Sequence, residues 1–241
     1  MNSPTINAIQ SASENDQIAV LLLADIAPTH RLWGWSRMVQ GPRALRRTDG
    51  LLFAKVLGSG YEGGFGLKPS ASRQGVFALF SSLQTAHAFI DRSPLVQAYK
   101  ARSQEFFSMT MQAWSCRGSW DGQSLAVAGQ APVDVPIAAL TRASIRMGKA
   151  AAFWRYAPAA QSALDHTQGC QLAVGLGEAP LLRQATFTLW DSVSHMDAYA
   201  RSGAHLTAIQ AAAKHGYFFE SMFARFSPLT LSGQWKGKHY G

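Results

Sequence analysis

Cysteine, charged residues and long apolar runs are all scarce in this chain of 241 residues. The two cysteines, Cys116 and Cys170, exclude a framework of disulfides and a zinc site built from cysteines. The longest apolar run, Ile18 to Ala24, has seven residues, whereas a membrane span needs roughly 20. The N-terminal residues also lack the basic and apolar regions of a signal peptide. We therefore expect a disordered tail over residues 1–17 and a cytoplasmic location, with peripheral contact at the inner membrane as an open alternative.

Acidic residues are the scarcer of the two charge types, with 14 Asp and Glu against 22 Lys and Arg, so the net charge is +8. The densest basic group is Arg43, Arg46 and Arg47, and no nucleic-acid-binding motif accompanies it. A solvated helix end is therefore favoured over a nucleic-acid patch, and we expect no nucleic-acid partner. The same positive field would attract an acidic redox protein or anionic lipid headgroups.

The chain repeats itself. Ile18–Trp35 aligns with Ile137–Trp154 without a gap at a shift of 119, and six positions are identical. Arg73–Phe80 matches Arg183–Trp190 at a shift of 110, and a Gly-x-Trp-x-Gly sequence closes each half. So many matches in the same order indicate an internal duplication. The halves are 18–122 and 137–241, joined by a linker over 123–136 and preceded by the tail.

Each half has the pattern of a strand, a helix, two strands, a helix and a strand, which is the ferredoxin-like βαββαβ unit. The first half is expected to contain strand Ile18–Asp25, helix Arg31–Arg46, strands Leu51–Leu57 and Gln74–Phe80, and helix Leu83–Phe107 broken near Pro94. The second is expected to contain Ile137–Ser144, Lys149–Leu164, Gln171–Leu176, Gln184–Trp190, and Val193–Phe223 broken near Gly203. Two such units bury their bare sheet faces together. We therefore predict an α+β fold in which two tandem ferredoxin-like repeats form a pseudo-dimeric α+β barrel.

The first half carries nine extra residues between its middle strands, because the shift falls from 119 to 110 there. They lie in GSGYEGGFGLKPSAS, which has five glycines but no strand–loop–helix context for a nucleotide site. A long hairpin loop is the favoured interpretation, and a lid over a pocket in the barrel is the functional alternative.

His205 is the clearest position at which the halves differ in chemistry, because Leu95 stands at its place in the first half. The segment around it is rich in alanine, which would let a large planar ligand approach the helix. Imidazole is a common axial ligand of haem iron. On spacing alone, an ordinary half-buried or surface histidine is the favoured interpretation.

The other histidines carry a weaker signal. His195, His205 and His215 are ten residues apart, and on a helix each step rotates the side chain by about 280°, so they do not share a face. His166 is expected in a loop. No HExxH, paired-carboxylate or Ser-His-Asp pattern is present, so no hydrolase apparatus is visible.

Arg183 and Gln184 enter the third strand of the second half, and Arg73 and Gln74 occupy the equivalent places. Either side chain, pointing into an apolar barrel, could form a hydrogen bond with a propionate, dioxygen or a carbonyl. Because both halves have the pair, a structural role at the barrel rim is slightly favoured.

Several strings resemble a known family. These are LTRASIR (Leu140–Arg146), GLGEAPLLRQATFTLW (Gly175–Trp190), the His205 segment ending GYFFESMFARF (Gly216–Phe226), and GSGYEGGFG (Gly58–Gly66). They are similar to the spheroidene monooxygenase family, the acyclic carotenoid ketolases, and the resemblance runs from about Ile18 to Gly237.

The resemblance implies a haem-dependent monooxygenase that uses dioxygen and electrons from a reduced ferredoxin to hydroxylate a linear carotenoid. A second hydroxylation of the same carbon gives a geminal diol, which loses water to form a ketone. The resemblance favours His205 as the iron ligand of haem b, with Arg142 and Tyr217 as further cofactor-binding candidates. Arg183 and Gln184 are the catalytic candidates.

Two alternatives stay open. One is a haem enzyme of another class, a dehydratase or a peroxidase-like protein, on the same barrel. The other is a non-catalytic carrier of haem or of a hydrophobic ligand. A homo-oligomer is left open as well.

Overall fold

The computed structural model describes residues 16–241 apart from 65, 67, 157–158, 160–163, 165–166 and 180–181. The predicted tail, up to residue 15, and His166 therefore lie outside the described residues. The strands are β1 (Ile18–Ile26), β2 (Leu51–Gly60), β3 (Pro69–Phe80), β4 (Ser103–Gly118), β5 (Ile137–Ile145), β6 (Cys170–Ala179), β7 (Arg183–Trp190), β8 (Phe218–Trp235) and β9 (Lys238–Tyr240). The α-helices are α1 (Arg31–Gln40), α2 (Leu83–Arg92), α3 (Pro94–Arg102), α4 (Ala150–Trp154), α6 (Val193–Ala200) and α7 (Gly203–His215), and short 3-10 turns cover Pro28–His30, Gly41–Leu45, Tyr61–Gly63 and Met147–Lys149.

Eight antiparallel strands form a closed barrel in the order β4-β1-β3-β2-β6-β7-β5-β8, and β8 pairs back onto β4. The two junctions between the halves differ in length. β2 meets β6 only at Gly58 and Ser59, whereas β4 and β8 pair from Phe107 opposite Gly233 to Gly118 opposite Met222. The predicted α+β barrel is confirmed at this level.

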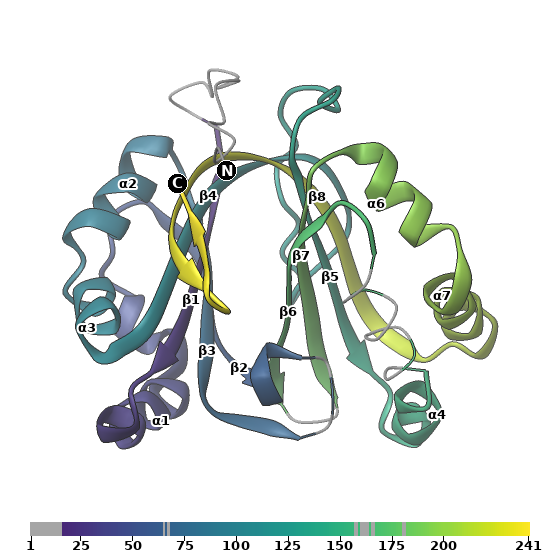
Figure 1. Cartoon of the computed structure of the whole chain (residues 1–241), viewed down its shortest axis with the longest axis horizontal. Coiled ribbons are helices and arrows are strands. Elements are labelled where there is room, and N and C mark those ends of the chain that lie inside the picture. The colour runs from purple at the N-terminus through teal and green to yellow at the C-terminus, as the bar shows by residue number, and fades with distance from the viewer. Residues whose placement is uncertain are drawn as a thin grey trace.

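The helices lie outside the barrel in two groups (Figure 1). Helices α1, α2 and α3 flank the first four strands, and α4, α6 and α7 flank the second four. Both halves therefore have the same order of strands and helices along the chain. In the predicted linker, 123–136, Gln123 forms an isolated bridge with Trp120, and residues 124–136 contain neither a helix nor a strand.

Three predicted helix ends are wrong. The helix predicted to reach Phe107 ends at Arg102, because the next residues belong to β4 and send alternate side chains into the barrel. The helix predicted to reach Phe223 ends at His215, where Gly216 adopts a left-handed conformation with φ of 59°. The first helix ends at Gln40, before Gly41 with φ of 54°. The predicted breaks near Pro94 and Gly203 are confirmed.

The barrel interior is one apolar core with contributions from both halves, so it is filled by packed side chains. Outside the barrel the halves differ. A single continuous cluster joins α1, α2 and α3 to their strands. Under the helices of the second half, the described residues form two separate, smaller clusters, one around Trp190 and one around Tyr217. No helix in the described part of the chain is long and apolar enough to cross a membrane.

Candidate functional site

The sheet surface that faces α6 and α7 carries small side chains where the first half carries large ones. Along β5, Thr141 takes the place of Leu22, and along β7, Thr186 takes the place of Val76. In β6, Gly175 replaces Val56. Leu22 and Val76 are 2% exposed, whereas Thr141 and Thr186 are only partly buried. The second half thus leaves its sheet incompletely covered by the described residues.

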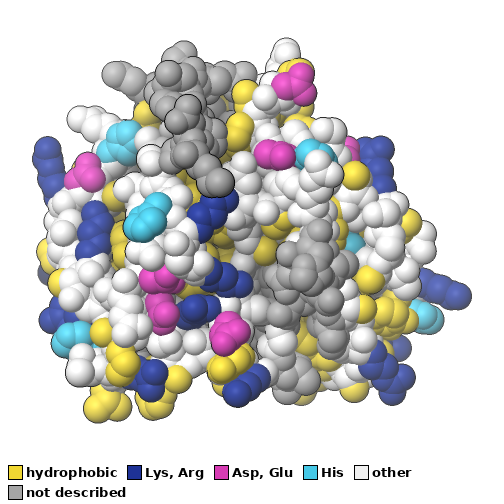
Figure 2. All heavy atoms as spheres, viewed as in Figure 1, with side chains coloured by type: hydrophobic (Ala, Val, Ile, Leu, Met, Phe, Trp, Pro, Cys, Tyr) yellow, Lys and Arg dark blue, Asp and Glu magenta, His cyan; other side chains and the backbone are white. Residues whose placement is uncertain are grey.

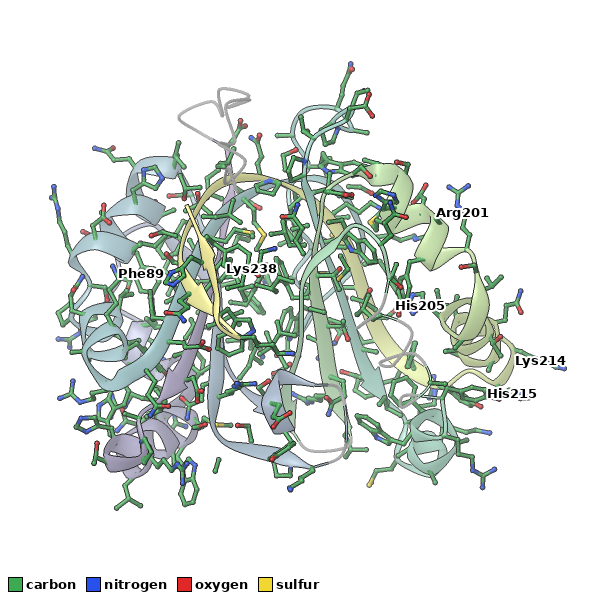
Figure 3. All side chains as sticks on the ribbon, viewed as in Figure 1. Phe89, Arg201, His205, Lys214, His215 and Lys238 are labelled. Carbon is green, nitrogen blue, oxygen red and sulfur yellow. The ribbon has the colours of Figure 1, made fainter. Side chains whose placement is uncertain are left out.

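His205 lies on α7 and faces this thinly packed sheet surface (Figure 3). Its ring stacks on Tyr199 of α6 at 4.7 Å between centroids. Burial lowers the pKa of His205, so the imidazole is neutral at pH 7. No described residue forms a hydrogen bond with either ring nitrogen. A neutral imidazole with free nitrogens is the form that ligates a metal.

The other two histidines of this region are placed differently. His195 is held at the start of α6 by Asp191, whose Oδ1 lies 2.7 Å from the ring Nδ1. His215 is exposed in the last turn of α7, where its ring stacks on Tyr217 at 5.7 Å. His205 is therefore the histidine that the fold directs toward the sheet.

Tyr217 and Arg142 end up on different sides of the sheet. Tyr217 is buried in the small cluster at the foot of α7, with Ala211 and Ala212. Arg142 points to the barrel side of β5, because side chains alternate along a strand and its neighbour Thr141 takes the helix side. Of the two predicted cofactor residues, the structure brings only Tyr217 to the helix that carries His205.

Arg142 belongs to a group of charges at one end of the barrel. It is 1% exposed, it pairs with Glu220, and its guanidinium lies over Trp120 at 5.6 Å. The group as a whole joins Lys55, Asp121, Arg142, Glu178, Arg183 and Glu220. Burial would raise the pKa of Glu220, but the Gly122 N–H and the Arg142 guanidinium outweigh it and lower this pKa to about 2. The predictions from sequence missed Lys55, Glu178 and Glu220, which come from three separate strands.

Arg183 and Gln184 are adjacent in β7 and point in opposite directions. Arg183 is half exposed on the barrel side, 3.8 Å from Glu178 and 4.0 Å from Asp121. Gln184 takes the helix side, as Thr186 does, and lies beside Gly177, where an added Cβ would be 3.3 Å from its Oε1. The structure therefore places only Gln184 on the face that His205 approaches.

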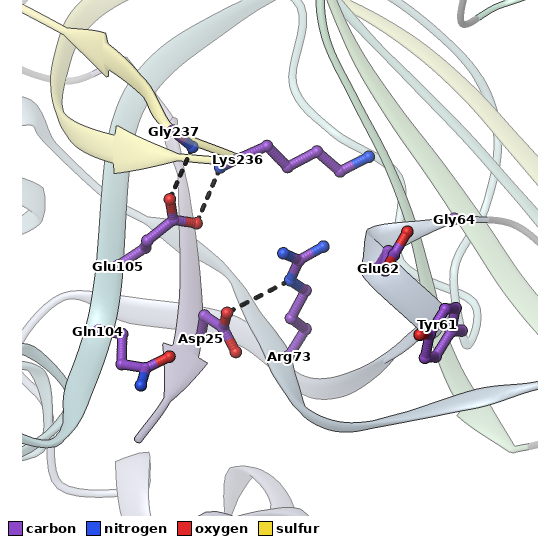
Figure 4. A pocket seen from close by; sticks show the side chains of 9 residues that line it. All are labelled: Asp25, Tyr61, Glu62, Gly64, Arg73, Gln104, Glu105, Lys236 and Gly237. Carbon is purple, nitrogen blue, oxygen red and sulfur yellow. Dashed lines mark hydrogen bonds and ion pairs between the residues drawn. The ribbon is translucent and has the colours of Figure 1, made fainter. Parts of the chain in front are cut away.

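An open cavity of about 710 Å³ lies beside the glycine-rich loop (Figure 4). It is polar, and its lining residues are Asp25, Tyr61, Glu62, Gly64, Arg73, Gln104, Glu105, Lys236 and Gly237. Glu105 accepts hydrogen bonds from the backbone N–H groups of Lys236 and Gly237, and Arg73 pairs with Asp25 at 3.5 Å. The loop thus borders a cavity, but its described lining does not suit an apolar substrate.

Comparison with known proteins adds independent information. The chain is 56% identical over 93% of its length to a spheroidene monooxygenase of Rubrivivax gelatinosus, covering 87% of that protein. It is 35% identical over 86% of its length to the spheroidene monooxygenase of Rhodobacter capsulatus, again covering 87%. No family model matches the chain.

Among solved structures, an aldoxime dehydratase has the same fold, with a TM-score of 0.57 and 12% identity over 91% of this chain and 84% of that one. A second aldoxime dehydratase, in complex with butyraldoxime, has a TM-score of 0.55 and 10% identity over 90% of this chain and 81% of that one. These likenesses concern the fold, whereas the identities above concern the whole sequence. The chain therefore belongs to the spheroidene monooxygenase family and is an oxidoreductase.

Proposed function

We propose that this enzyme binds haem b through His205 and uses dioxygen with electrons from a ferredoxin-type reductant to oxygenate a large apolar substrate of the carotenoid class. The relatives' name supports the substrate class and the reaction type. The observation that carries the cofactor assignment is the partly buried, neutral His205 on α7, a helix that flanks the strands in which Thr141, Gly175 and Thr186 replace larger residues.

The residues present fit a haem. A bare metal ion needs several protein ligands, and no group of three or more His, Cys, Asp or Glu side chains suited to a metal occurs among the described residues. Haem iron already has four porphyrin nitrogens, so one neutral imidazole is a sufficient protein ligand. Bound haem would supply the activation of dioxygen.

The roles of the other residues follow from where they lie. Gln184 and Thr186 are two of the polar side chains on the helix-facing side of the sheet, so they are suited to form hydrogen bonds with an oxygen species or a propionate. Tyr217 packs at the foot of α7 and positions that helix. Arg142 and Arg183 lie on the barrel side with Glu178, which gives them the structural role of closing the barrel end.

The proposed reaction needs one electron donor, the ferredoxin-type reductant, besides dioxygen and the substrate. Each hydroxylation consumes one dioxygen, two electrons and two protons, and yields the alcohol and one water. A second hydroxylation at the same carbon gives a geminal diol, which loses water to a ketone. The apolar wall around Trp190 and Met196 keeps water away from the site. The positive net charge suits an acidic electron donor.

We also infer that the halves are duplicated ferredoxin-like repeats arranged as a pseudo-dimer. The turn at the end of each half donates a hydrogen bond to a glutamate of the other half. The Gly122 N–H donates to Glu220 at 2.9 Å, and the Gly237 N–H donates to Glu105 at 2.6 Å. Such reciprocal contacts are what a two-fold symmetric dimer would have.

The cofactor assignment is tested by purifying the protein with haem supplied during expression. The wild type should show a Soret band, and His205→Ala should lose it, because the iron loses its only protein ligand. His215→Ala, a change of the same kind in the same helix at an exposed position, should keep the band. A colourless wild type, or a His205→Ala variant with an unchanged spectrum, would overturn the assignment.

Oxidation of an apolar polyene then tests the reaction. The haem-loaded enzyme should convert it only when both dioxygen and a reduced ferredoxin are present. Conversion without dioxygen would indicate a dehydratase, and tight binding without conversion would indicate a carrier.

A further inference from the structure

Helix α1 presents an apolar stripe to solvent. Leu32 is 80% exposed, Trp35 is 51% exposed and Val39 is 86% exposed. At 100° per residue, these three side chains lie within about 60° of one another around the helix. The opposite side of α1 is properly packed, since Trp33 stacks edge-on against Tyr99 at 5.0 Å. The stripe is therefore a surface feature in its own right, unlike a single exposed leucine.

Basic residues accompany this stripe. Residues 26–48 contain five arginines and no Asp or Glu. Arg31, at the start of α1, is exposed beside Leu32. Arg46 and Arg47 are exposed too, but they lead into Leu51 at the opposite end of the sheet. Apolar side chains flanked by uncompensated positive charge are typical of segments that lie in the headgroup region of a membrane.

The pseudo-equivalent segment of the second half has the same character. Met147 is 81% exposed just before α4, between the exposed Arg146 and Lys149. Residues 135–164 contain no Asp or Glu at all. Between the two segments lies the glycine-rich loop, where Tyr61 is 52% exposed and the Lys68 ammonium lies over its ring at 4.0 Å.

These three segments lie at one end of the molecule. Helices α1 and α4 mark the two lower corners in Figure 1, and the glycine-rich loop lies between them. Figure 2 shows apolar and basic side chains side by side along the same lower edge. The linker over 123–136 lies toward the opposite end. We call the lower end the docking face and define it by Arg31, Leu32, Trp35, Val39, Tyr61, Met147 and Lys149.

We propose that the docking face binds the surface of an anionic lipid bilayer. Each arginine near such a surface is attracted by its negative potential, and the apolar side chains insert at the boundary of headgroups and acyl chains. A second copy of this chain suits the face less well, because two such faces would bring like charges together. Binding to the bilayer would bring the enzyme to its substrate, because a carotenoid-like molecule dissolves there. This consequence rests on the proposed function.

Sedimentation of the full-length protein with lipid vesicles tests the proposed binding. One set of vesicles contains phosphatidylcholine and phosphatidylglycerol, and the other contains phosphatidylcholine alone. The wild type should sediment with the anionic vesicles, and high salt should weaken its binding. The variant Leu32→Gln/Val39→Gln should bind at least tenfold more weakly, and so should Arg31→Gln/Arg146→Gln/Lys149→Gln. The matched control is Val127→Gln/Val133→Gln, which changes two exposed valines of the linker and should bind as the wild type does.

Several results would overturn the proposal. They are a wild type that stays in the supernatant, an apolar-stripe variant with unchanged binding, and a control variant as weak as the stripe variant. A wild-type dimer that becomes monomeric in Leu32→Gln/Val39→Gln would instead identify the face as an interface between copies. Vesicle binding needs neither haem nor substrate, so its failure is separate from a failure of the haem assignment.

Discussion

Two buried tryptophans at equivalent places in the two halves differ in one hydrogen bond. Trp120 and Trp235 are each 1% exposed and both belong to the barrel core. The indole Nε1 of Trp120 donates to Glu178 at 2.7 Å. At a shift of 119, Ser59 takes the place of Glu178, and no described residue accepts a hydrogen bond from the Nε1 of Trp235. The two tryptophans therefore provide a comparison, within one chain, of a buried donor with and a buried donor without a described hydrogen-bond partner.

Replacing each tryptophan by phenylalanine should separate the hydrogen bond from the packing. Both Trp120→Phe and Trp235→Phe remove the same atoms. The cavities that they leave should therefore lower the free energy of unfolding by similar amounts. Only Trp120→Phe also breaks a charge-assisted hydrogen bond, and it should lower the free energy of unfolding by about 1–3 kcal/mol more. Urea denaturation measures both values. Equal losses would mean that the bond to Glu178 contributes nothing.

At the scale of elements, the two halves differ in the size of the side chains that their strands point toward the helices. In the first half, β1 and β3 present large apolar side chains, and these merge with α2 and α3 into one cluster. In the second half, β5 and β7 present Thr141 and Thr186 at the equivalent places, and the clusters separate. The proposed cofactor site lies on this face because the described residues cover Thr141 and Thr186 less completely than Leu22 and Val76.

Restoring first-half residues should close the proposed haem site. The variant Thr141→Leu/Thr186→Val should stay folded, with a melting temperature equal to or above that of the haem-free wild type, because it adds apolar contacts. It should also lose the Soret band. A variant that retains full haem would show that the cofactor binds elsewhere.

The control is the reverse substitution at the equivalent position of the first half. Leu22→Thr creates a cavity and buries a hydroxyl in the first half, so it should cost about 2–4 kcal/mol of unfolding free energy. It should keep the Soret band at temperatures where the protein is folded. Absorbance and thermal denaturation on the same samples measure both effects.

At the scale of the whole molecule, neither half covers the barrel-side face of its own strands. The barrel interior draws side chains from all eight strands, and the long β4–β8 junction joins the halves. Glu105 of the first half caps the last turn of the second, and Glu220 of the second caps the turn that ends the first. The halves therefore depend on each other.

We expect the protein to unfold in one cooperative transition. Tryptophan fluorescence and far-UV circular dichroism should give the same urea midpoint, because opening the barrel exposes both halves at once. Fragments 18–122 and 137–241, expressed separately, should be unfolded or form paired assemblies. Two separate transitions in the intact chain would show instead that the halves are independent domains.

Local patterns predicted part of this molecule well. The strand Ile18–Asp25 is β1 with one residue added, and Pro94 ends one helix and starts another. The helix ends after α3 and α7 were wrong, because apolar residues such as Phe106 and Phe107 suit a helix as well as a strand in the absence of their partners. The charge group around Arg142 could not be predicted, since its members lie up to 165 residues apart, from Lys55 to Glu220.

The sequence by itself determined the order of strands and helices, the matching segments that predict a duplication, and the asymmetry of His205 against Leu95, because these depend on residue identity and short-range periodicity. The tertiary structure decided which residues share a face. It placed Arg142 and Arg183 on the barrel side, and it placed Gln184 on the helix-facing side, where α7 carries His205. The physical reason is that side chains in a strand alternate between two faces, so one residue of register sends neighbouring side chains to opposite sides of the sheet.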